Sequence, residues 1–149
     1  MPQLSMHSPV GDLSISEEDG AIVSLDWGWG SIQGETPLLS RARDQLNAYF
    51  DGDATPFVLP LIPHGTPFQQ KVWAAMRRIP YGQTTTYGDM AKELGSAARA
   101  VGGACRRNPL PILVPCHRVL GAGGRLGGYS GDGGLETKTS LLRLERALL

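Results

Sequence analysis

The residues with the clearest potential for chemistry are Cys116 and His117, which are adjacent in the sequence. A cysteine thiolate is a strong, soft nucleophile, and a neighbouring histidine is a common base for generating it. Pro115 precedes the pair, and residues 121–134 follow closely with eight glycines in 14 positions. A rigid residue on one side and permissive backbone on the other favour a reactive site. A buried structural cysteine is nevertheless the commoner role, and the pair alone leaves both interpretations open.

A second unusual feature is a helix-forming segment, residues 97–107, that carries almost no bulky side chain. Its small residues are Ala97, Ala98, Ala100, Gly102, Gly103 and Ala104. Two glycines inside a helix cost roughly 1 kcal/mol each relative to alanine, so a neighbour must come very close to this helix. That neighbour is either a tightly packed second helix or a groove of nucleic acid, to which Arg99, Arg106 and Arg107 add positive charge.

The remaining cysteine, Cys105, lies in the same segment and is predicted to line the core or a pocket. The chain has no CxxC and no Cys/His cluster at zinc spacing, so we expect no metal ion and two reduced thiols. We see no basic, apolar signal segment and no run of about 20 apolar residues. These absences predict a soluble cytoplasmic protein without a membrane span.

The charge of the chain is unevenly distributed. Its 149 residues hold 14 basic and 14 acidic side chains, and 41% are hydrophobic, which suits one or two small domains with a real core. Residues 1–64 contain two bases and nine acids, 2 − 9 = −7, whereas residues 65–149 contain 12 bases and five acids, 12 − 5 = +7. A net charge of zero argues against a nucleic-acid partner, but the local charge of the second part favours one.

The elements that must position these residues fall into two groups. In the first part, strands are expected at 13–16 and 21–25 around an Asp-Gly turn, and a helix at 37–50 before a proline-rich connector. In the second part, three helices are expected at 67–79, at about 86–94 and at 97–107, the last of them capped by Ser96. Residues 112–114 are expected to form a buried extended segment, and a last helix to cover about 136–148. The second and third of these helices form a helix-turn-helix pattern, which by itself is weak support for DNA binding.

The segment Pro115-Cys116-His117-Arg118-Val119 resembles the active-site signature of O6-alkylguanine-DNA alkyltransferases. Further family motifs match in order and cover essentially all of residues 65–149: Gly65-Thr66-Pro67-Phe68-Gln69, Val72-Trp73, Ile79-Pro80-Tyr81-Gly82, Thr86-Tyr87-Gly88, Arg99-Ala100-Val101-Gly102, Asn108-Pro109, Gly127-Gly128-Tyr129-Ser130-Gly131, Lys138, Leu141-Leu142 and Glu145. Residues 1–64 are similar to the family's N-terminal domain only in size and strand–helix pattern.

The resemblance implies an α+β fold. A small acidic N-terminal strand–helix domain with a proline-rich connector, residues 1–64, precedes a mainly helical, winged helix-turn-helix-like domain at 65–149 that binds DNA and accepts the alkyl group. It also implies that Cys116 is the acceptor, that His117 acts through a water as its base, and that Glu145 orients the histidine. Asn108 would brace the turn between the recognition helix and the active site.

The same resemblance implies how DNA is handled. Arg99 would insert into the duplex where the damaged nucleotide leaves the stack, and Tyr87 would help to rotate the base outward. The other residues implied to contact substrate or DNA are Ala98, Gly102, Arg106, Pro111, Val119, Tyr129, Ser130 and Lys138. Relative to the common family pattern, the turn before Arg99 is about two residues shorter, and the loop before Lys138 is about two residues longer.

The function implied is DNA repair by direct, irreversible transfer of an alkyl group, such as methyl, from O6-alkylguanine in flipped-out double-stranded DNA to Cys116. The protein would be a monomeric, single-turnover methyltransferase without cofactors that binds the minor groove. One alternative is a lesion sensor resembling alkyltransferase-like proteins, which bind and flip the base but replace the acceptor cysteine. Another is a Cys-His hydrolase, which would leave the thin basic helix unexplained.

Overall fold

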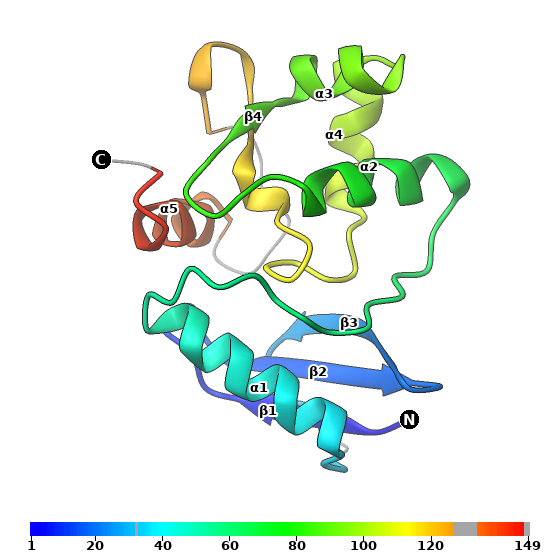
Figure 1. Cartoon of the computed structure of the whole chain (residues 1–149), viewed down its shortest axis with the longest axis vertical. Helices are drawn as coiled ribbons and strands as arrows, with labels where there is room; N and C mark the ends of the chain where they lie inside the picture. Colours follow the sequence, from blue (N-terminus) through cyan, green and yellow to red (C-terminus); the bar gives the residue numbers. More distant parts are fainter. Residues whose placement is uncertain (32, 127–133, 148–149) are drawn as a thin grey trace. The chain divides into compact units, whose positions relative to one another are not determined.

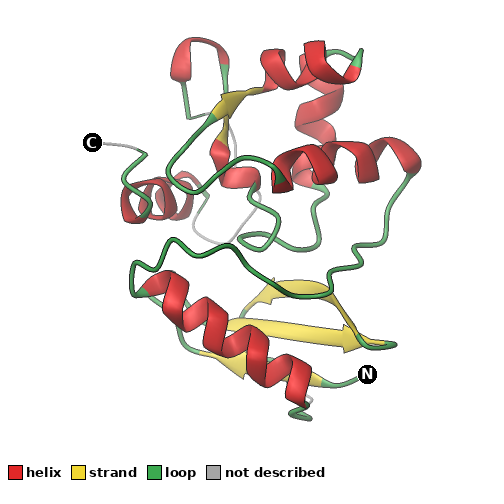
Figure 2. Cartoon of the chain, in the orientation of Figure 1, coloured by secondary structure: helices red, strands yellow, loops and turns green. Residues whose placement is uncertain are grey.

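The computed structural model describes residues 1–31, 33–126 and 134–147. The chain divides into two compact units, Met1–His64 and Gly65–Leu149. Figure 2 shows strands and one long helix in the first unit and mostly helices in the second. This arrangement confirms the predicted α+β class. Among the described residues, no helix has the length and apolar character needed to cross a bilayer.

The first unit is a three-stranded antiparallel sheet with one helix (Figure 1). The strands follow the chain in the order β1 (Gln3–Met6), β2 (Leu13–Glu18) and β3 (Ala21–Trp27). Asp19 and Gly20 join β2 to β3 with φ angles of 51° and 80°, as a type I′ hairpin turn requires. The predicted hairpin is therefore confirmed, while β1 is an element that sequence patterning did not identify.

Helix α1 (Pro37–Phe50) contacts all three strands and has the bounds expected from its apolar face. Thr36 caps its first turn, because its side-chain oxygen accepts a hydrogen bond from the Leu39 N–H at 3.1 Å. Leu39 and Leu46 lie on its buried face and have no exposed surface. The helix and the sheet thus give the acidic unit its own hydrophobic core.

In its described residues, the second unit is built from four helices joined by short turns and two-residue strands. Its helices are α2 (Pro67–Arg77), α3 (Tyr87–Leu94), α4 (Ala98–Arg106) and α5 (Leu135–Leu144). Strands β4 (Thr85–Thr86) and β5 (Val119–Leu120) pair in parallel, and 3₁₀ turns cover η1 (Cys116–Arg118) and η2 (Ala122–Gly124). This scaffold brings the turn before Tyr87 beside the chain that follows Cys116.

Local sequence explains where the helices of the second unit begin. Thr66 and Gln69 form a capping box before α2, and Thr86 caps α3 by accepting from the Asp89 N–H. The Trp73 indole then ties α2 to α4 by donating to the Ala104 carbonyl at 2.9 Å. Because this bond lies in the interior, it fixes the helix-turn-helix pair α3–α4 against α2.

Three sequence expectations for the second unit are wrong in detail. The N-cap of α4 is Ala97, which makes no side-chain capping bond, rather than Ser96. Residues 112–114 are buried but form turns instead of an extended segment, since Ile112 has a φ of 74°. The last helix ends at Leu144, after which Arg146 adopts a left-handed φ of 61° that a helix cannot continue through.

Candidate active site

Cys116 is the first residue of the η1 turn and is almost completely buried. Two three-residue turns place it, because the Leu113 N–H donates to Pro111 O at 2.9 Å and the Cys116 N–H donates to Val114 O at 2.8 Å. The first turn is centred on Ile112 with positive φ, a conformation that is costly for a β-branched residue. The chain before the thiol is therefore a tightly specified bend.

Asn108 holds this bend from the end of α4. Its Nδ2 donates to Val114 O at 2.9 Å, and its Oδ1 accepts from the Leu110 N–H at the same distance. Both side-chain functions of the amide are used, so its orientation is fixed. Asn108 thus connects the end of α4 to the bend before Cys116.

His117 and Glu145 meet inside the second unit, 28 residues apart in the sequence. Nε2 of His117 lies 2.7 Å from Oε2 of Glu145, and neither side chain has exposed surface. Arg118 donates to both oxygens of the same carboxyl, at 2.8 and 3.0 Å. Because these two bonds require acceptors, Glu145 is a carboxylate, and Nε2 carries the imidazole proton.

The other imidazole nitrogen, Nδ1 of His117, is buried and has no hydrogen-bond partner among the described residues. With Nε2 protonated, Nδ1 holds the lone pair and acts as an acceptor. A buried acceptor without a protein partner is costly unless a water or a reacting group satisfies it. Nδ1 belongs to the residue that follows Cys116, so it is the candidate for the base that the resemblance implies.

Burial sets the resting charge of these groups. It raises the pKa of the Cys116 thiol above its ordinary value, against an opposing effect of the Asn108 side chain. Burial also lowers the pKa of His117, against the hydrogen bond that its Nε2 donates to Glu145, which acts to raise it. At neutral pH the site therefore rests as a thiol beside a neutral imidazole.

Lys138 is also fully buried, and its Nζ donates to Val119 O at 2.8 Å. Burial lowers the pKa of this amine, and its ammonium lies 5.8 Å from the centre of the Tyr87 ring. The residue lies in the interior rather than on the surface of the unit. Val119 and Pro111, both assigned to the substrate pocket by resemblance, are buried as well.

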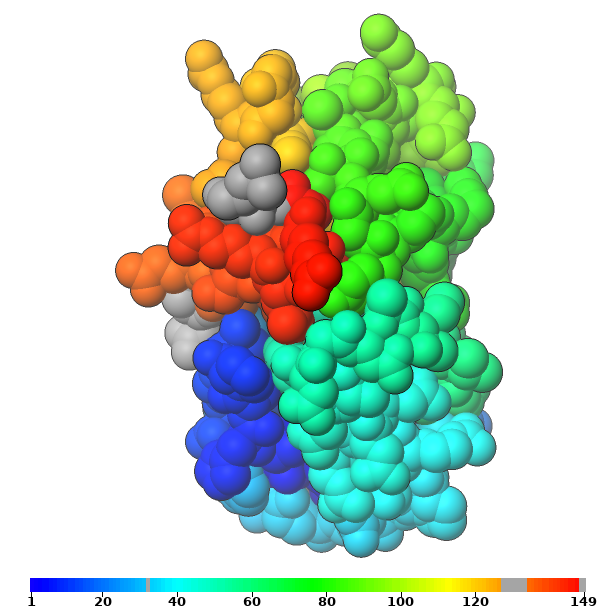
Figure 3. All heavy atoms as spheres, turned by 60° about the vertical axis from the view of Figure 1, so that its left-hand side comes forward, coloured from blue at the N-terminus to red at the C-terminus, as the bar shows by residue number. Residues whose placement is uncertain are grey.

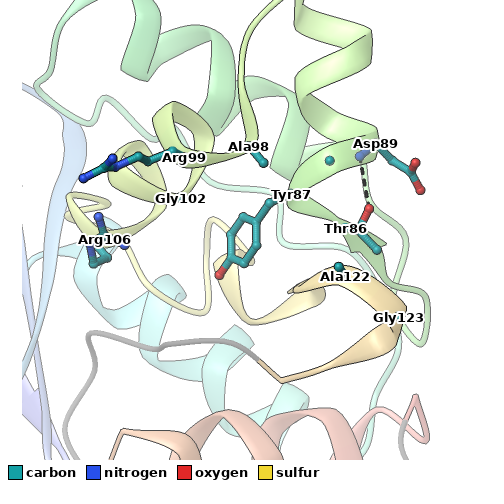
Figure 4. A pocket seen from close by; sticks show the side chains of 10 residues that line it. Thr86, Tyr87, Asp89, Ala98, Arg99, Gly102, Arg106, Ala122 and Gly123 are labelled. Carbon is teal, nitrogen blue, oxygen red and sulfur yellow. Dashed lines mark hydrogen bonds between the residues drawn. The ribbon is translucent and has the colours of Figure 1, made fainter.

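A hollow of about 620 Å³ opens at the surface beside α3 and α4. Its lining includes Tyr87 and four α4 residues that the resemblance assigns to DNA or substrate, namely Ala98, Arg99, Gly102 and Arg106. Figure 4 shows the Tyr87 ring pointing into the hollow between α4 and the turn with Ala122 and Gly123. Burial and the neighbouring thiols raise the pKa of the Tyr87 phenol to about 12, so it is a hydrogen-bond donor at neutral pH.

The glycines of α4 are not explained by tight helix packing. A Cβ added at Gly102 would have only the Arg106 guanidinium within 4 Å, at 3.8 Å, among the described atoms considered. At Gly103 the corresponding distance is 4.0 Å, again to Arg106. No atom of a neighbouring helix in the described structure needs this space. The alternative of a groove-binding surface is therefore favoured over internal packing.

Two predicted pocket residues, Tyr129 and Ser130, lie outside the described residues. Cys105 is buried, and its thiol lies 3.6 Å from the Met76 sulfur. Sequence reasoning missed the bond between Arg118 and Glu145, and it missed Ala122 and Gly123 as part of the hollow. Arg118 stands within the active-site signature, and this position could have indicated that it pairs with a residue of the site. In the described ranges there is no group of three potential metal ligands.

Comparison with known proteins covers both units. The DNA-binding domain of 6-O-methylguanine DNA methyltransferase matches residues 67–147, and the ribonuclease-like domain of the same proteins matches residues 4–63. The chain belongs to the 6-O-methylguanine DNA methyltransferase family. Its first unit, for which residue patterning indicated only a strand–helix domain, is thus covered by a family domain too.

Individual family members are similar over nearly their whole length. The constitutive methylated-DNA–protein-cysteine methyltransferase of Bacillus subtilis is 49% identical over 93% of this chain and 92% of its own. The methylated-DNA–protein-cysteine methyltransferase of Mycobacterium leprae is 44% identical over 95% and 90%. The crystal structure of Mycobacterium tuberculosis OGT in complex with DNA has a TM-score of 0.89 at 42% identity and covers 99% of this chain and 94% of that one.

Proposed function

We propose that this protein is a methylated-DNA–protein-cysteine methyltransferase that repairs DNA by moving an alkyl group from O6-alkylguanine directly to Cys116. The observation that carries the proposal is the buried Cys116 thiol, followed in the chain by the neutral imidazole of His117. Nε2 of this imidazole is hydrogen-bonded to Glu145 at 2.7 Å, and Nδ1 has no partner among the described residues. This arrangement of side chains occurs in a member of the 6-O-methylguanine DNA methyltransferase family. A similar protein of that family is named methylated-DNA–protein-cysteine methyltransferase. No cofactor is needed, because the alkylated base itself supplies the group.

The proposed reaction begins with the proton of the Cys116 thiol, which passes through a water to Nδ1 of His117. The sulfur attacks the alkyl carbon, so the S–C bond forms as the C–O6 bond breaks. The electron pair left on the base takes up the proton that the His117 imidazolium releases through water, which restores guanine and the neutral imidazole. A thioether is not hydrolysed under these conditions, so each protein molecule reacts once and the transfer is irreversible.

The DNA side of the proposal rests on the surface of α4. Its small residues allow a duplex backbone to approach, and Arg99 and Arg106 border the hollow with positive charge. We place α4 in the minor groove, where little sequence is read, which suits a search over all DNA. Arg99 then fills the space of the flipped nucleotide, and Tyr87 crowds its phosphate and contacts the guanine.

We further propose that the protein works as a monomer on double-stranded DNA in the cytoplasm. The two thiols are free in the structure, which fits a reducing compartment. The roles proposed for Asn108, Pro111, Val119 and Lys138 are to brace and line the pocket, and the resemblance assigns Tyr129 and Ser130 to substrate contact as well.

The two cysteines provide a matched test of the proposal. Cys116→Ala should bind an O6-methylguanine duplex with nearly unchanged affinity and transfer no methyl group, because only the nucleophile is removed. Cys105→Ala should still transfer, since Cys105 contacts Met76 and has no part in the reaction. Binding is measured by fluorescence anisotropy and transfer by loss of O6-methylguanine from the DNA. Full transfer by Cys116→Ala, or its loss only in Cys105→Ala, would contradict the assignment.

A further inference from the structure

Arg118 is mostly buried, and hydrogen bonds to Glu145 and to the backbone fix its side chain. Its side chain is only 10% exposed, and three of its N–H groups are bonded. Nε donates to Oε1 of Glu145 at 2.8 Å, Nη2 donates to Oε2 at 3.0 Å, and Nη1 donates to the Ile79 carbonyl at 2.7 Å. The Tyr81 ring lies 5.9 Å from the guanidinium carbon. A two-pronged contact of this kind fixes the plane of the carboxylate as well as its distance.

Glu145 is consequently unable to turn without breaking several bonds. Its Oε2 is shared between Arg118 and Nε2 of His117, while its Oε1 also faces the Gly82 N–H at 3.4 Å. The end of α5 lies against the turn after α2 (Figure 3). There the Tyr81 hydroxyl donates to Leu144 O at 3.2 Å. The plane of the carboxylate in turn sets the direction in which the imidazole presents Nδ1.

The charges around His117 come from two elements. Glu145, directly after α5, favours the imidazolium, whereas Arg118 on the same turn as His117 and Lys138 on α5 oppose it. Cys116, the preceding residue, is an uncharged thiol at rest because burial raises its pKa. Without Arg118, only burial and Lys138 would oppose the carboxylate, so the imidazole would take a proton onto Nδ1 more readily. A protonated Nδ1 has no lone pair and cannot accept the thiol proton.

We propose that Arg118 is a positioning residue for alkyl transfer, which fixes the Glu145 carboxylate through two hydrogen bonds and offsets its charge so that His117 rests as a neutral base. Its effect on His117 is a property of the free protein. Only its effect on the rate rests on the proposed function.

The first measurement is the titration of the His117 imidazole by ¹⁵N NMR in the full chain, with His7 and His64 as internal references. Arg118→Met keeps an unbranched side chain without charge and should raise the pKa of His117 by about one unit or more, a tenfold gain in proton affinity. Arg118→Lys keeps the charge without the two-pronged contact, so the pKa of His117 should rise by less than in Arg118→Met.

The second measurement is the single-turnover transfer rate against pH with an O6-methylguanine duplex. For Arg118→Met, the acidic limb should move to higher pH by the same amount as the His117 titration. For Arg118→Lys, the rate should fall at every pH with little movement of the limb, since the carboxylate loses its fixed plane. A purely structural role predicts a uniform fall with an unmoved limb in both variants.

The double variant Arg118→Met/Glu145→Gln provides the rescue. It removes the carboxylate whose charge Arg118 offsets, so the pKa of His117 should return toward the low wild-type value. A folded Arg118→Met with an unchanged His117 pKa overturns the proposal. If Arg118→Met does not fold, the double variant and Arg118→Lys carry the test, and an elevated His117 pKa in the double variant overturns it. Failure of the wild type to transfer would refute the proposed function but leave the NMR result intact.

Discussion

Cys116 combines a strong nucleophile with an environment that keeps it protonated. Burial raises its pKa, so the thiol is not spontaneously reactive, and its proton must be removed within the site. His117 is suited to that step because its own pKa is lowered and its Nδ1 is an open acceptor. In the proposed reaction, deprotonation of the thiol is therefore coupled to its attack on the bound substrate.

The buried thiols predict a loss of stability at alkaline pH. Burial raises the pKa of Cys105 to about 12, whereas the pKa of a thiol in an unfolded chain is about 8.5. Above that pH the unfolded chain has released protons that the folded protein retains, so the free energy of unfolding should fall as the pH rises. Cys105→Ala should show a weaker decline between about pH 8.5 and 10, measured by urea denaturation at a series of pH values.

On the acidic side, His117 makes the free energy of unfolding rise with pH, which is the opposite slope to that of the thiols. The folded pKa of His117 is below its unfolded value, so the unfolded chain binds the extra proton first as the pH falls below about 6.5. Stability should therefore decrease there too, which places the maximum between these limits. A free energy of unfolding that rises steadily from pH 8.5 to 10 in both proteins would contradict the burial of the thiols.

At the scale of single residues, the chemistry of Cys116 and His117 made them candidates, but the pair alone left a structural role open until the family motifs were recognised. Glu145 came only from the family resemblance, because a partner 28 residues away is set by the fold and not by spacing. The pairing of Arg118 with Glu145 was not predicted for the same reason. A charged residue in a sequence does not reveal whether it faces solvent or a buried carboxylate.

The bend before Cys116 shows why one element was predicted wrongly. Residues 112–114 are a short apolar run, and such runs are indistinguishable from a buried strand by periodicity. The structure instead has Ile112 at a φ of 74°, with Asn108 bonded on both sides of the bend. These hydrogen bonds and the prolines at 111 and 115 override the strand preference of the run. Helix α1, whose cap, periodicity and stop signals agree, was predicted with its observed bounds.

Replacing a glycine of helix α4 by alanine is expected to increase stability and, at Gly102, to weaken DNA binding. Gly102→Ala and Gly103→Ala should each raise the free energy of unfolding by about 0.5–1 kcal/mol, because alanine favours a helix and space for Cβ is present. Only Gly102 lines the hollow. Gly102→Ala should therefore weaken duplex binding by about tenfold, equivalent to about 1.4 kcal/mol, with Gly103→Ala less affected.

Thermal or urea unfolding and anisotropy with an undamaged duplex measure the two effects on the same samples. Weaker folding of both variants with unchanged DNA binding would instead point to an internal packing role for these glycines.

At the scale of the whole molecule, a net charge of zero separates into −7 for residues 1–64 and +7 for residues 65–149. The motifs that carry the proposed function all lie in the second part. The acidic unit should reduce long-range attraction to DNA, since charges interact over about 30 Å at 0.01 M salt but only about 10 Å at 0.1 M.

Exposed acids of the first unit allow this to be measured. The triple variant Glu18→Gln, Asp26→Asn and Asp51→Asn should bind undamaged duplex a few-fold more tightly at low salt, with the gain vanishing at high salt. A control with Glu18→Asp, Asp26→Glu and Asp51→Glu keeps the charge and should behave as the wild type. Equal affinities of all three proteins at low salt would show that the acidic unit does not oppose binding.

The central claim is that one alkyl group moves to one cysteine, and peptide mass spectrometry tests it most directly. The protein is titrated with a duplex that contains O6-methylguanine, and the modified peptide and its stoichiometry are determined. The prediction is a single methyl group on Cys116, with repair ending after one equivalent of DNA. Binding without modification, methylation at another residue, or repeated turnover by one protein molecule would contradict the account.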